Sequence, residues 1–407
     1  MALVGTFIVY IIMACLVIGA LASIFRPGSA LGNQFQDGIH SIGPIFLCVA
    51  GIFASIPFLT SFIELFIGPL FSWLGADPSI APTTIIAVDM GGYQLAEALA
   101  KTKENWIMAM YTGYMAGATI VFIIPVGLKF IRKQDESYFA LGIMAGLLSI
   151  PFGVLVACVI TALGDPVIRS SITTVDGAMY QLNMNMAEVF LNLIPLASVC
   201  IVIALGLRFK PGMMIRGFIY FGRFLEISTK LILVASILEI FTGVFSTLFG
   251  SWGFDPVIAD EKNLERALEI VGYVCMMLAG AFPMVYLIQT YCAKPLGKIG
   301  RVVGLSPSAT AALLAASANV IAMFPMLADM RARDKVLAIS YSVCGAFLIG
   351  DHLSFMANFQ PTLILPLFLG KIFGGTIGLI IAQRIAVPEA LKIESAESLT
   401  ENESTAA

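Results

Sequence analysis

The sequence predicts an all-α protein that crosses a membrane several times. Of its 407 residues, 59% are hydrophobic and only 12% are charged, whereas soluble domains carry about 25% charged residues. The mean hydropathy is +0.93. Because backbone polar groups find no water in hydrocarbon, long apolar runs cross it as helices. There is no basic stripe with interleaved aromatic residues, so nucleic acid is not an expected partner.

Nine stretches are long and apolar enough to span a hydrocarbon core, which is about 30 Å thick. They are approximately 4–25, 42–67, 105–128, 138–162, 185–207, 226–250, 267–290, 336–358 and 362–384. The first lacks the basic region and the small-residue cleavage site of a signal peptide, so we expect it to be retained. The seven cysteines are scattered singly, which is typical of core packing.

Two further segments, 75–100 and 304–330, begin with Pro and Ser and are polar in the middle. If both are re-entrant, entering and leaving on one side, fifteen Lys and Arg residues lie inside and four outside. If both cross fully, the count becomes nine inside and ten outside. Since cytoplasmic loops carry the excess of basic residues, the sequence favours two re-entrant segments with broken helices.

The two broken segments also resemble each other in sequence. Four positions repeat at one constant offset of 229 residues, and they pair Gly51, Gly75, Pro78 and Ser79 with Gly280, Gly304, Pro307 and Ser308. A span precedes and a span follows each segment, and the preceding spans run in opposite directions on the charge count. An inverted repeat with broken helices meeting near the midplane is the common plan of secondary transporters. We therefore predict this architecture.

The predicted organisation has a first half, 1–210, and a second half, 226–387. Between them, 211–225 is basic and aromatic. It is explained equally well as an interfacial amphipathic connector or as an extension of the next span. The acidic tail 388–407 has no large apolar residue after Leu399 and is predicted to be disordered. The connector and the aromatic spans also suggest a homodimer or trimer within the lipid.

Charged side chains inside the membrane are the first candidates for a binding site, because each costs about 2.5–3.5 kcal/mol on insertion scales. Asp89 lies just before Gly91 and Gly92, in the middle of the first broken segment. Its carboxylate could pair with a cation, and the alternative role is to cap a half-helix. We predict that this D-M-G-G stretch belongs to a substrate site.

A second candidate group lies in the late span 336–358. Asp351, Ser354 and Asn358 are separated by three and four residues and therefore share one helix face. The neighbouring His352 could be a titrating gate, a proton carrier or a hydrogen-bonded core histidine. We expect this face to line a polar cavity.

The second broken segment has no acid at its centre, but it offers Ser317 and Asn319. An amide can donate and accept hydrogen bonds at a lower desolvation cost than a carboxylate. Both residues are therefore further candidates for contact with a polar substrate.

The sequence predicts a transporter and not an enzyme. It contains no G-x-G-D, G-x-S-x-G or H-E-x-x-H motif and no P-loop. The clustered acids that would hold a metal are missing, so no metal or other cofactor is expected. A facilitative pore is still compatible with the sequence, although the Asn-Pro-Ala repeat of aquaporin-like pores is absent.

Three stretches resemble the bacterial ethanolamine-utilisation permease family, and they are GADPSIAPTTIIAVDMGGYQLAEALA, LNLIPLASVCIVIALGLRF and AFLIGDHLSFMAN. The similarity extends from the second span to the last, and D-M-G-G and G-D-H are its most specific motifs. One departure is at Asn319, where the family has two adjacent asparagines. The resemblance implies a multi-pass protein of the cytoplasmic membrane that moves ethanolamine inward to a cobalamin-dependent ammonia-lyase.

The implied substrate suggests roles for the candidate residues. Protonated ethanolamine is a small cation with one hydroxyl, so taking it out of water requires a carboxylate or carbonyl cage and a hydroxyl partner. We expect Asp89 or Asp351 to bind the ammonium and Tyr93 to add a cation–π face. The expected hydroxyl partners are Asn319, Ser354 and Asn358.

We expect transport by alternating access, in which the unit with both broken segments moves against the other spans. The sequence leaves coupling to protons open. The alternative functions are an ion-coupled transporter for another small amine or polar metabolite, and a facilitative pore.

Overall fold

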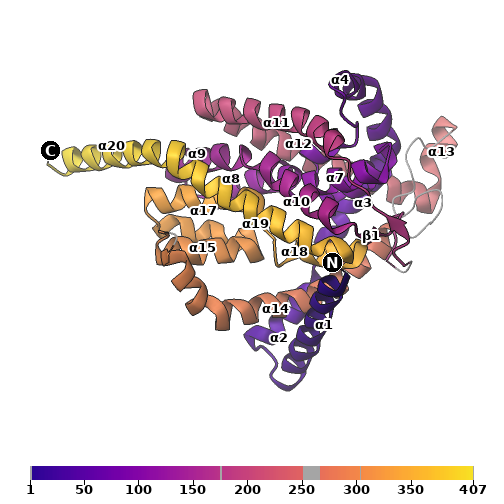
Figure 1. The fold of residues 1–407 in the computed structure, drawn as a ribbon, viewed down its shortest axis with the longest axis horizontal. Coiled ribbons are helices and arrows are strands. Elements are labelled where there is room, and N and C mark those ends of the chain that lie inside the picture. Colours follow the sequence, from indigo (N-terminus) through magenta and orange to yellow (C-terminus); the bar gives the residue numbers. More distant parts are fainter. Residues whose placement is uncertain (1, 175–176, 251–265, 303, 407) are drawn as a thin grey trace.

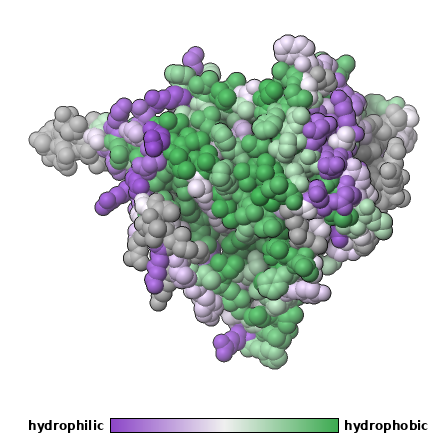
Figure 2. Space-filling view, viewed as in Figure 1, coloured by the Kyte–Doolittle hydropathy of each residue, from purple (hydrophilic) through white to green (hydrophobic). Residues whose placement is uncertain are grey.

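The computed structural model describes residues 2–174, 177–250, 266–302 and 304–406, and this part of the chain is helical almost throughout (Figure 1). Figure 2 shows a broad hydrophobic surface in the middle of the molecule, with hydrophilic residues gathered mainly toward two opposite ends. Helices α10 and α19 pack side by side across this apolar region. This is the distribution expected of helices that cross hydrocarbon between two polar surfaces.

Seven stretches of the described residues are long and apolar enough to cross a membrane. They are Leu3–Phe25, Ala30–Phe71, Lys103–Phe130, Lys133–Gly164, Met186–Phe209, Ala267–Cys292 and Pro361–Glu397. Each contains one of the nine predicted spans. The other two, 226–250 and 336–358, are helical but interrupted.

The first half of the chain contains these elements: α1 (Ala2–Phe25), α2 (Ala30–His40), α3 (Ile42–Phe62), η1 (Ile63–Ile67), α4 (Gly68–Trp73), α5 (Ile80–Ile85), η2 (Val88–Met90), α6 (Gly92–Leu99), α7 (Lys103–Thr112), η3 (Gly113–Ile123), α8 (Ile124–Phe130), η4 (Lys133–Asp135), α9 (Glu136–Leu147), α10 (Ile150–Gly164) and α11 (Met186–Phe209). Here η1 and η3 are π-helical, whereas η2 and η4 are 3₁₀ turns. Before α11, β1 (Val167–Ile168) pairs antiparallel with β2 (Tyr180–Gln181), with Val167 opposite Gln181.

The second half contains α12 (Pro211–Thr242), α13 (Val244–Phe249), α14 (Arg266–Val302), α15 (Pro307–Ala318), α16 (Val320–Met323), η5 (Phe324–Asp329), α17 (Ala332–Gly345), α18 (Asp351–Phe359), η6 (Pro361–Leu363), α19 (Ile364–Ile381), η7 (Ala382–Ala386) and α20 (Val387–Ala406). Residues 211–225 form the start of the 32-residue helix α12, so they extend the following helix, which was one of the two predicted alternatives. Gly243, with a φ of 58°, ends α12 inside the predicted span 226–250.

The C-terminal segment differs from the disordered tail predicted for 388–407. Helix α20 continues to Ala406, and residue 407 lies outside the described residues. The Glu394 carboxylate accepts a hydrogen bond from the Ala332 amide (3.1 Å), and Glu397 accepts one from the Tyr138 hydroxyl (2.8 Å). These contacts join the acidic segment to α17 and α9.

Both predicted broken segments are interrupted helices in the structure. In the first, α5 ends at Ile85, Ile86 is extended (φ −101°, ψ 130°), and Gly91 adopts a φ of 96° before α6. In the second, Asn319 is extended (φ −153°, ψ 121°) between α15 and α16. The interruptions coincide with the polar centres of the two sequences.

A third interruption divides the predicted span 336–358. Helix α17 ends at Gly345 and α18 begins at Asp351, with Phe347 at a φ of 59° between them. The Phe347 amide donates to the Ala316 carbonyl (3.0 Å) and the Ile349 amide to the Ser317 carbonyl (2.9 Å). The prediction of one continuous helix is therefore wrong, because backbone bonds to the end of α15 replace helical bonds there.

The offset of 229 residues also relates helix boundaries. Residues Lys103–Phe130 form one continuous helical stretch, and α17 and α18 together extend from Ala332 to Phe359. The first residues of the two stretches are 229 apart in the sequence, and so are the last residues. Gly75 and Gly304 are both left-handed, with φ values of 73° and 77°. A side chain is strained in this conformation, which explains glycine at both corners.

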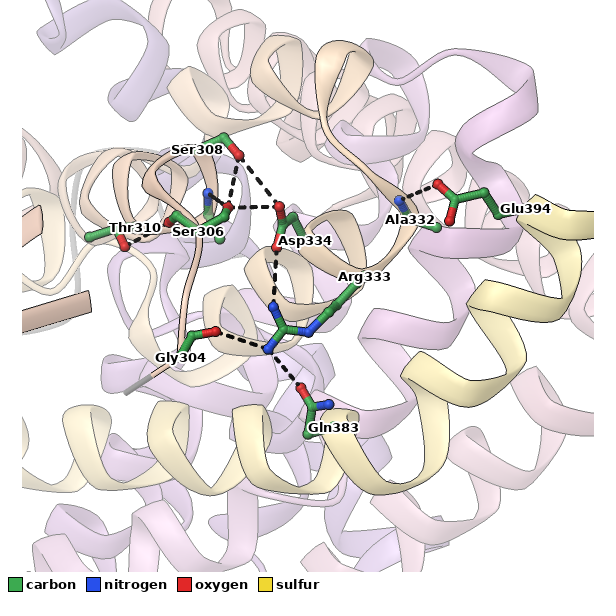
Figure 3. A network of polar contacts seen from close by, with 10 residues as sticks. Gly304, Ser306, Ser308, Thr310, Ala332, Arg333, Asp334, Gln383 and Glu394 are labelled. Carbon is green, nitrogen blue, oxygen red and sulfur yellow. Dashed lines mark hydrogen bonds and ion pairs between the residues drawn. The ribbon is translucent and has the colours of Figure 1, made fainter. Parts of the chain in front are cut away.

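Each broken segment is bonded at its start to the helix that follows it. In the first half, Asp77 Oδ1 accepts from the Ser79 amide (3.0 Å), and its Oδ2 accepts from the Lys101 amide (3.1 Å) just before α7. In the second half, the Ser306 hydroxyl donates to Asp334 Oδ2 (2.7 Å) on α17 (Figure 3). Position 77 corresponds to 306 at the offset of 229, so an aspartate makes this contact in the first half and a serine makes it in the second.

Candidate functional site

A cavity of about 190 Å³ lies where the first interruption meets the third. A single water occupies only about 10–15 Å³ on this measure, so the cavity has room for a small molecule. Helices α3 and α14 and the π-helix η3 complete its wall. Its lining residues are Pro44, Ile45, Ala87, Asp89, Met90, Ala118, Phe122, Val274, Phe347, Asp351 and His352.

Two carboxylates face this mostly apolar cavity. Asp89 belongs to the 3₁₀ turn η2, and Asp351 is the first residue of α18. Their charges lie close enough to interact. Asp89 Oδ1 is buried and has no hydrogen-bond partner among the described residues. The structure therefore brings together the two acids that the sequence singled out, and a cation is the ligand that would satisfy them.

His352 lies beside Asp351 and is 2% exposed. Its Nδ1 has no hydrogen-bond partner in the described part of the chain, and the same is true of the Tyr114 hydroxyl. The two rings pack edge to face with centroids 4.8 Å apart. Buried polar groups are normally paired, so His352 Nδ1 in the cavity lining, with the Tyr114 ring packed against it, is suited to bind a polar ligand.

Lys371 is a third buried charge, and the sequence analysis did not identify it. It lies on α19, is 1% exposed, and its Nζ donates to the Tyr114 carbonyl (2.9 Å). Its charge interacts with that of Asp89. The sequence did contain the signal, because a lysine in the apolar stretch 362–384 requires the same explanation as an aspartate.

Gly91 and Gly92 shape the first interruption and do not line the cavity. A Cβ on Gly91 would lie 2.5 Å from Ile52 Cγ2, and one on Gly92 would lie 2.7 Å from the carbonyl oxygens of Ile86 and Ala87. The Gly91 φ of 96° also favours glycine. These residues let the backbone of η2 pack closely enough to present Asp89.

Tyr93 is fully buried outside the cavity lining. Its ring stacks on Trp106 with centroids 4.7 Å apart, and it contacts the edge of Phe355 at 5.6 Å. Its hydroxyl accepts a hydrogen bond from Gln360 Nε2 (3.0 Å). The cation–π face expected of Tyr93 is thus covered by aromatic packing in this structure.

The four candidate hydroxyl and amide residues also lie outside the cavity lining, and each is engaged in local contacts. Ser317 bonds the Tyr341 hydroxyl (2.8 Å), and Asn319 Oδ1 accepts from the Ile321 amide (2.9 Å) to cap α16. Ser354 donates to the Gly350 carbonyl (3.1 Å), and Asn358 Nδ2 donates to the Tyr273 carbonyl (3.0 Å). These side chains support helix ends and helix contacts around the cavity.

The fold defines a multi-pass membrane protein, with a small cavity lined by two carboxylates. Comparison with known proteins gives its family. The family model described as "Ethanolamine utilisation protein, EutH" matches residues 4–385, and the chain belongs to this family. It is a multi-pass protein of the cytoplasmic membrane.

Several curated relatives are similar over most of their length. The chain is 34% identical over 398 residues to the "Probable ethanolamine permease EutH" of Listeria monocytogenes, covering 97% of this chain and 98% of the relative. It is 35% identical over 368 residues to the protein of the same name from Escherichia coli, covering 88% and 86%. The "Uncharacterized protein YxeR" of Bacillus subtilis is 33% identical over 369 residues, covering 90% and 91%. No solved structure matches the chain.

Proposed function

We propose that this protein is a carrier that moves protonated ethanolamine across the cytoplasmic membrane, and that the cavity between Asp89 and Asp351 is its substrate site. Relatives along nearly the whole chain bear the name of probable ethanolamine permease. The observation that carries the proposal is that two interacting carboxylates and His352, whose Nδ1 has no partner among the described residues, line one small cavity.

The chemistry of the substrate matches these groups. An aliphatic amine titrates near the lysine value of ~10.4, so ethanolamine is a cation at neutral pH. Its ammonium has three donors, which the oxygens of Asp89 and Asp351 accept. Its hydroxyl both donates and accepts, and His352 Nδ1 and the Tyr114 hydroxyl are its partners. These partners of the substrate hydroxyl differ from Asn319, Ser354 and Asn358, which the sequence predicted.

The proposed transport cycle is alternating access around this site. The matched boundaries at an offset of 229 support a repeated unit. In the proposed arrangement the units are inverted, so that the first and third interruptions approach the site from opposite sides. Broken helices that meet at a midplane site are typical of such carriers.

The test is saturable uptake of labelled ethanolamine into proteoliposomes at acidic pH, where little of the substrate is uncharged. We expect Asp89→Asn and Asp351→Asn each to lower uptake by 10-fold or more, because a charged hydrogen-bond partner contributes about 1.5–3 kcal/mol. Asp37→Asn is the matched control, since it removes an exposed carboxylate on α2. Counterflow into preloaded vesicles separates a carrier from a pore.

Substrate analogues test the two ends of the site separately. Ethylamine lacks the hydroxyl and should compete weakly, whereas ethanol lacks the charge and should not compete. Native uptake in both aspartate variants, with the protein folded, would contradict the proposed site. Absence of saturable, protein-dependent uptake in the native protein would contradict the proposed function.

A further inference from the structure

Lys371 is a buried basic residue next to the proposed substrate site, and the following inference rests on the function proposed above. The side chain is 1% exposed, and its only hydrogen bond among the described residues is to the Tyr114 carbonyl. Tyr114 lies in the π-helix η3, and its ring contacts His352, which lines the cavity. Lys371 is therefore connected to the cavity wall without lining it.

The groups that interact with Lys371 come from four different elements. Asp89 lies on η2, Tyr114 on η3, Cys344 on α17 and His352 on α18, and Asp351 interacts in turn with Asp89. Among these groups, the two aspartates are the acids and Lys371 is the strong base. His352 is 2% exposed, and in the proposed charge count it is the neutral imidazole.

With both aspartates ionised and Lys371 protonated, the charges of the site without substrate sum to −1. Two carboxylates contribute −2, and the Lys371 ammonium contributes +1. No ion pair within 4.0 Å joins Asp89, Asp351 or Lys371 to any described residue, so nothing else in this part of the chain balances the sum. An unbalanced buried charge is costly, and one monovalent cation brings the site to neutrality.

We propose that the site exchanges one protonated ethanolamine for one proton. When the ammonium leaves to the cytoplasm, a cytoplasmic proton binds one of the two carboxylates. The neutral, empty carrier then returns to the outward-facing state. There the proton leaves as the next protonated ethanolamine binds. One cation enters and one proton leaves in each cycle, and no net charge crosses the membrane.

This exchange has a specific thermodynamic consequence. The final distribution of ethanolamine is the same as if the neutral amine had diffused across the bilayer. The rate, however, follows the protonated form, which dominates at low pH, while passive diffusion follows the scarce neutral form. The carrier is then most useful in acidic surroundings, where it speeds uptake without dissipating the membrane potential.

The first test measures charge and protons in proteoliposomes that contain the native chain, with protein-free vesicles subtracted. We expect the initial rate of ethanolamine uptake to be unchanged when valinomycin and a potassium gradient impose an inside-negative potential. We also expect release of one external proton per ethanolamine taken up. Faster uptake at negative potential, or a sustained inward current without proton release, would overturn the exchange while leaving ethanolamine transport intact.

The second test is a charge rescue. Asp351→Asn makes the empty site neutral, so a bound cation would leave +1, and uptake should fall by at least 10-fold. Adding Lys371→Gln returns the site to −1 and keeps an N–H donor for the Tyr114 carbonyl. The double variant should recover at least 10-fold over Asp351→Asn alone.

The matched control is Asp351→Asn combined with Lys133→Gln, which removes an exposed positive charge outside the site and should stay inactive. A folded Asp351→Asn/Lys371→Gln variant that is no more active than Asp351→Asn would overturn the charge balance on which the exchange depends.

Discussion

Gly117→Ala tests whether close packing fixes the first interruption in the position that presents Asp89. A Cβ on Gly117 would lie 2.2 Å from the Ile86 carbonyl oxygen, 2.6 Å from its carbon and 2.7 Å from the Thr83 oxygen. Cβ contacts essentially never fall below 3.0 Å, so the oxygen of Ile86 must move by about 0.8 Å or more. All three atoms belong to the backbone, and Asp89 follows Ile86 by three residues.

The size of the effect follows from this displacement. Overpacking of a well-packed interior costs about 1–3 kcal/mol, and a shift of about 1 Å in a positioned group can lower a rate by about 100-fold. We therefore expect saturable ethanolamine uptake to fall by roughly 10- to 100-fold, together with a lower midpoint of thermal unfolding in detergent. Uptake in proteoliposomes and thermal unfolding are the two measurements.

Gly272→Ala provides the control, because nothing lies within 4 Å of its added Cβ on α14. In a helix, alanine is favoured over glycine by about 1 kcal/mol, so this variant should retain native uptake and stability. Native uptake and stability in Gly117→Ala as well would refute the reasoning, since the first interruption would then not depend on contact with η3.

Two further predictions concern single interactions. Tyr114→Phe removes a hydroxyl that has no partner among the described residues, so the free energy of unfolding should change by less than about 0.5 kcal/mol. The variant also loses one hydrogen bond to ethanolamine, about 0.5–1.5 kcal/mol, so KM should rise roughly 3- to 10-fold. An unchanged KM would exclude the hydroxyl from the site. Asp135→Asn leaves the Lys335 ammonium, 10% exposed, without its carboxylate partner. The free energy of unfolding, measured by denaturant unfolding, should therefore fall by about 3–5 kcal/mol. A change below about 0.5 kcal/mol would show that the pair is not structurally important.

Local signals in the sequence were sufficient to locate two of the three interruptions. Pro78 and Ser79 begin the first broken segment, and Gly91 and Gly92 interrupt it, as expected of residues with special backbone preferences. Asp89 and Asp351 were identified because charge inside an apolar run is rare. In both cases the relevant information lies within a few residues of the feature.

The third interruption could not be predicted in this way. Residues 346–349 are Ala, Phe, Leu and Ile, which suit a membrane helix. Their helical bonds are replaced by bonds to Ala316 and Ser317, which are about thirty residues away in the sequence. Likewise, nothing near Tyr114 indicates that its hydroxyl would lie unpaired beside His352, because that position depends on the packing of η3 against α18.

The hydroxyl candidates illustrate a local rule that the sequence analysis underused. Serine inside a helix commonly donates to the carbonyl four residues earlier, and Ser354 does so with Gly350. Asn319 behaves similarly as the cap of α16. Polarity within an apolar segment therefore indicates a ligand contact only after these local partners have been considered. An ionised carboxylate has no proton to donate to such a carbonyl, so the two aspartates were the stronger candidates.

The interruptions differ in what holds them. The first closes on itself, because the amides of Met90 and Gly92 donate to the Ala87 carbonyl (3.2 and 3.0 Å). The second and third are bonded to each other through Ala316 and Ser317, so Asp351 belongs mechanically to the second segment, whereas Asp89 belongs to the first. The separation of the two carboxylates is thus a gauge of how the two halves stand relative to each other. A pair of spectroscopic labels, one on each broken segment, would report conformational states even in the absence of substrate.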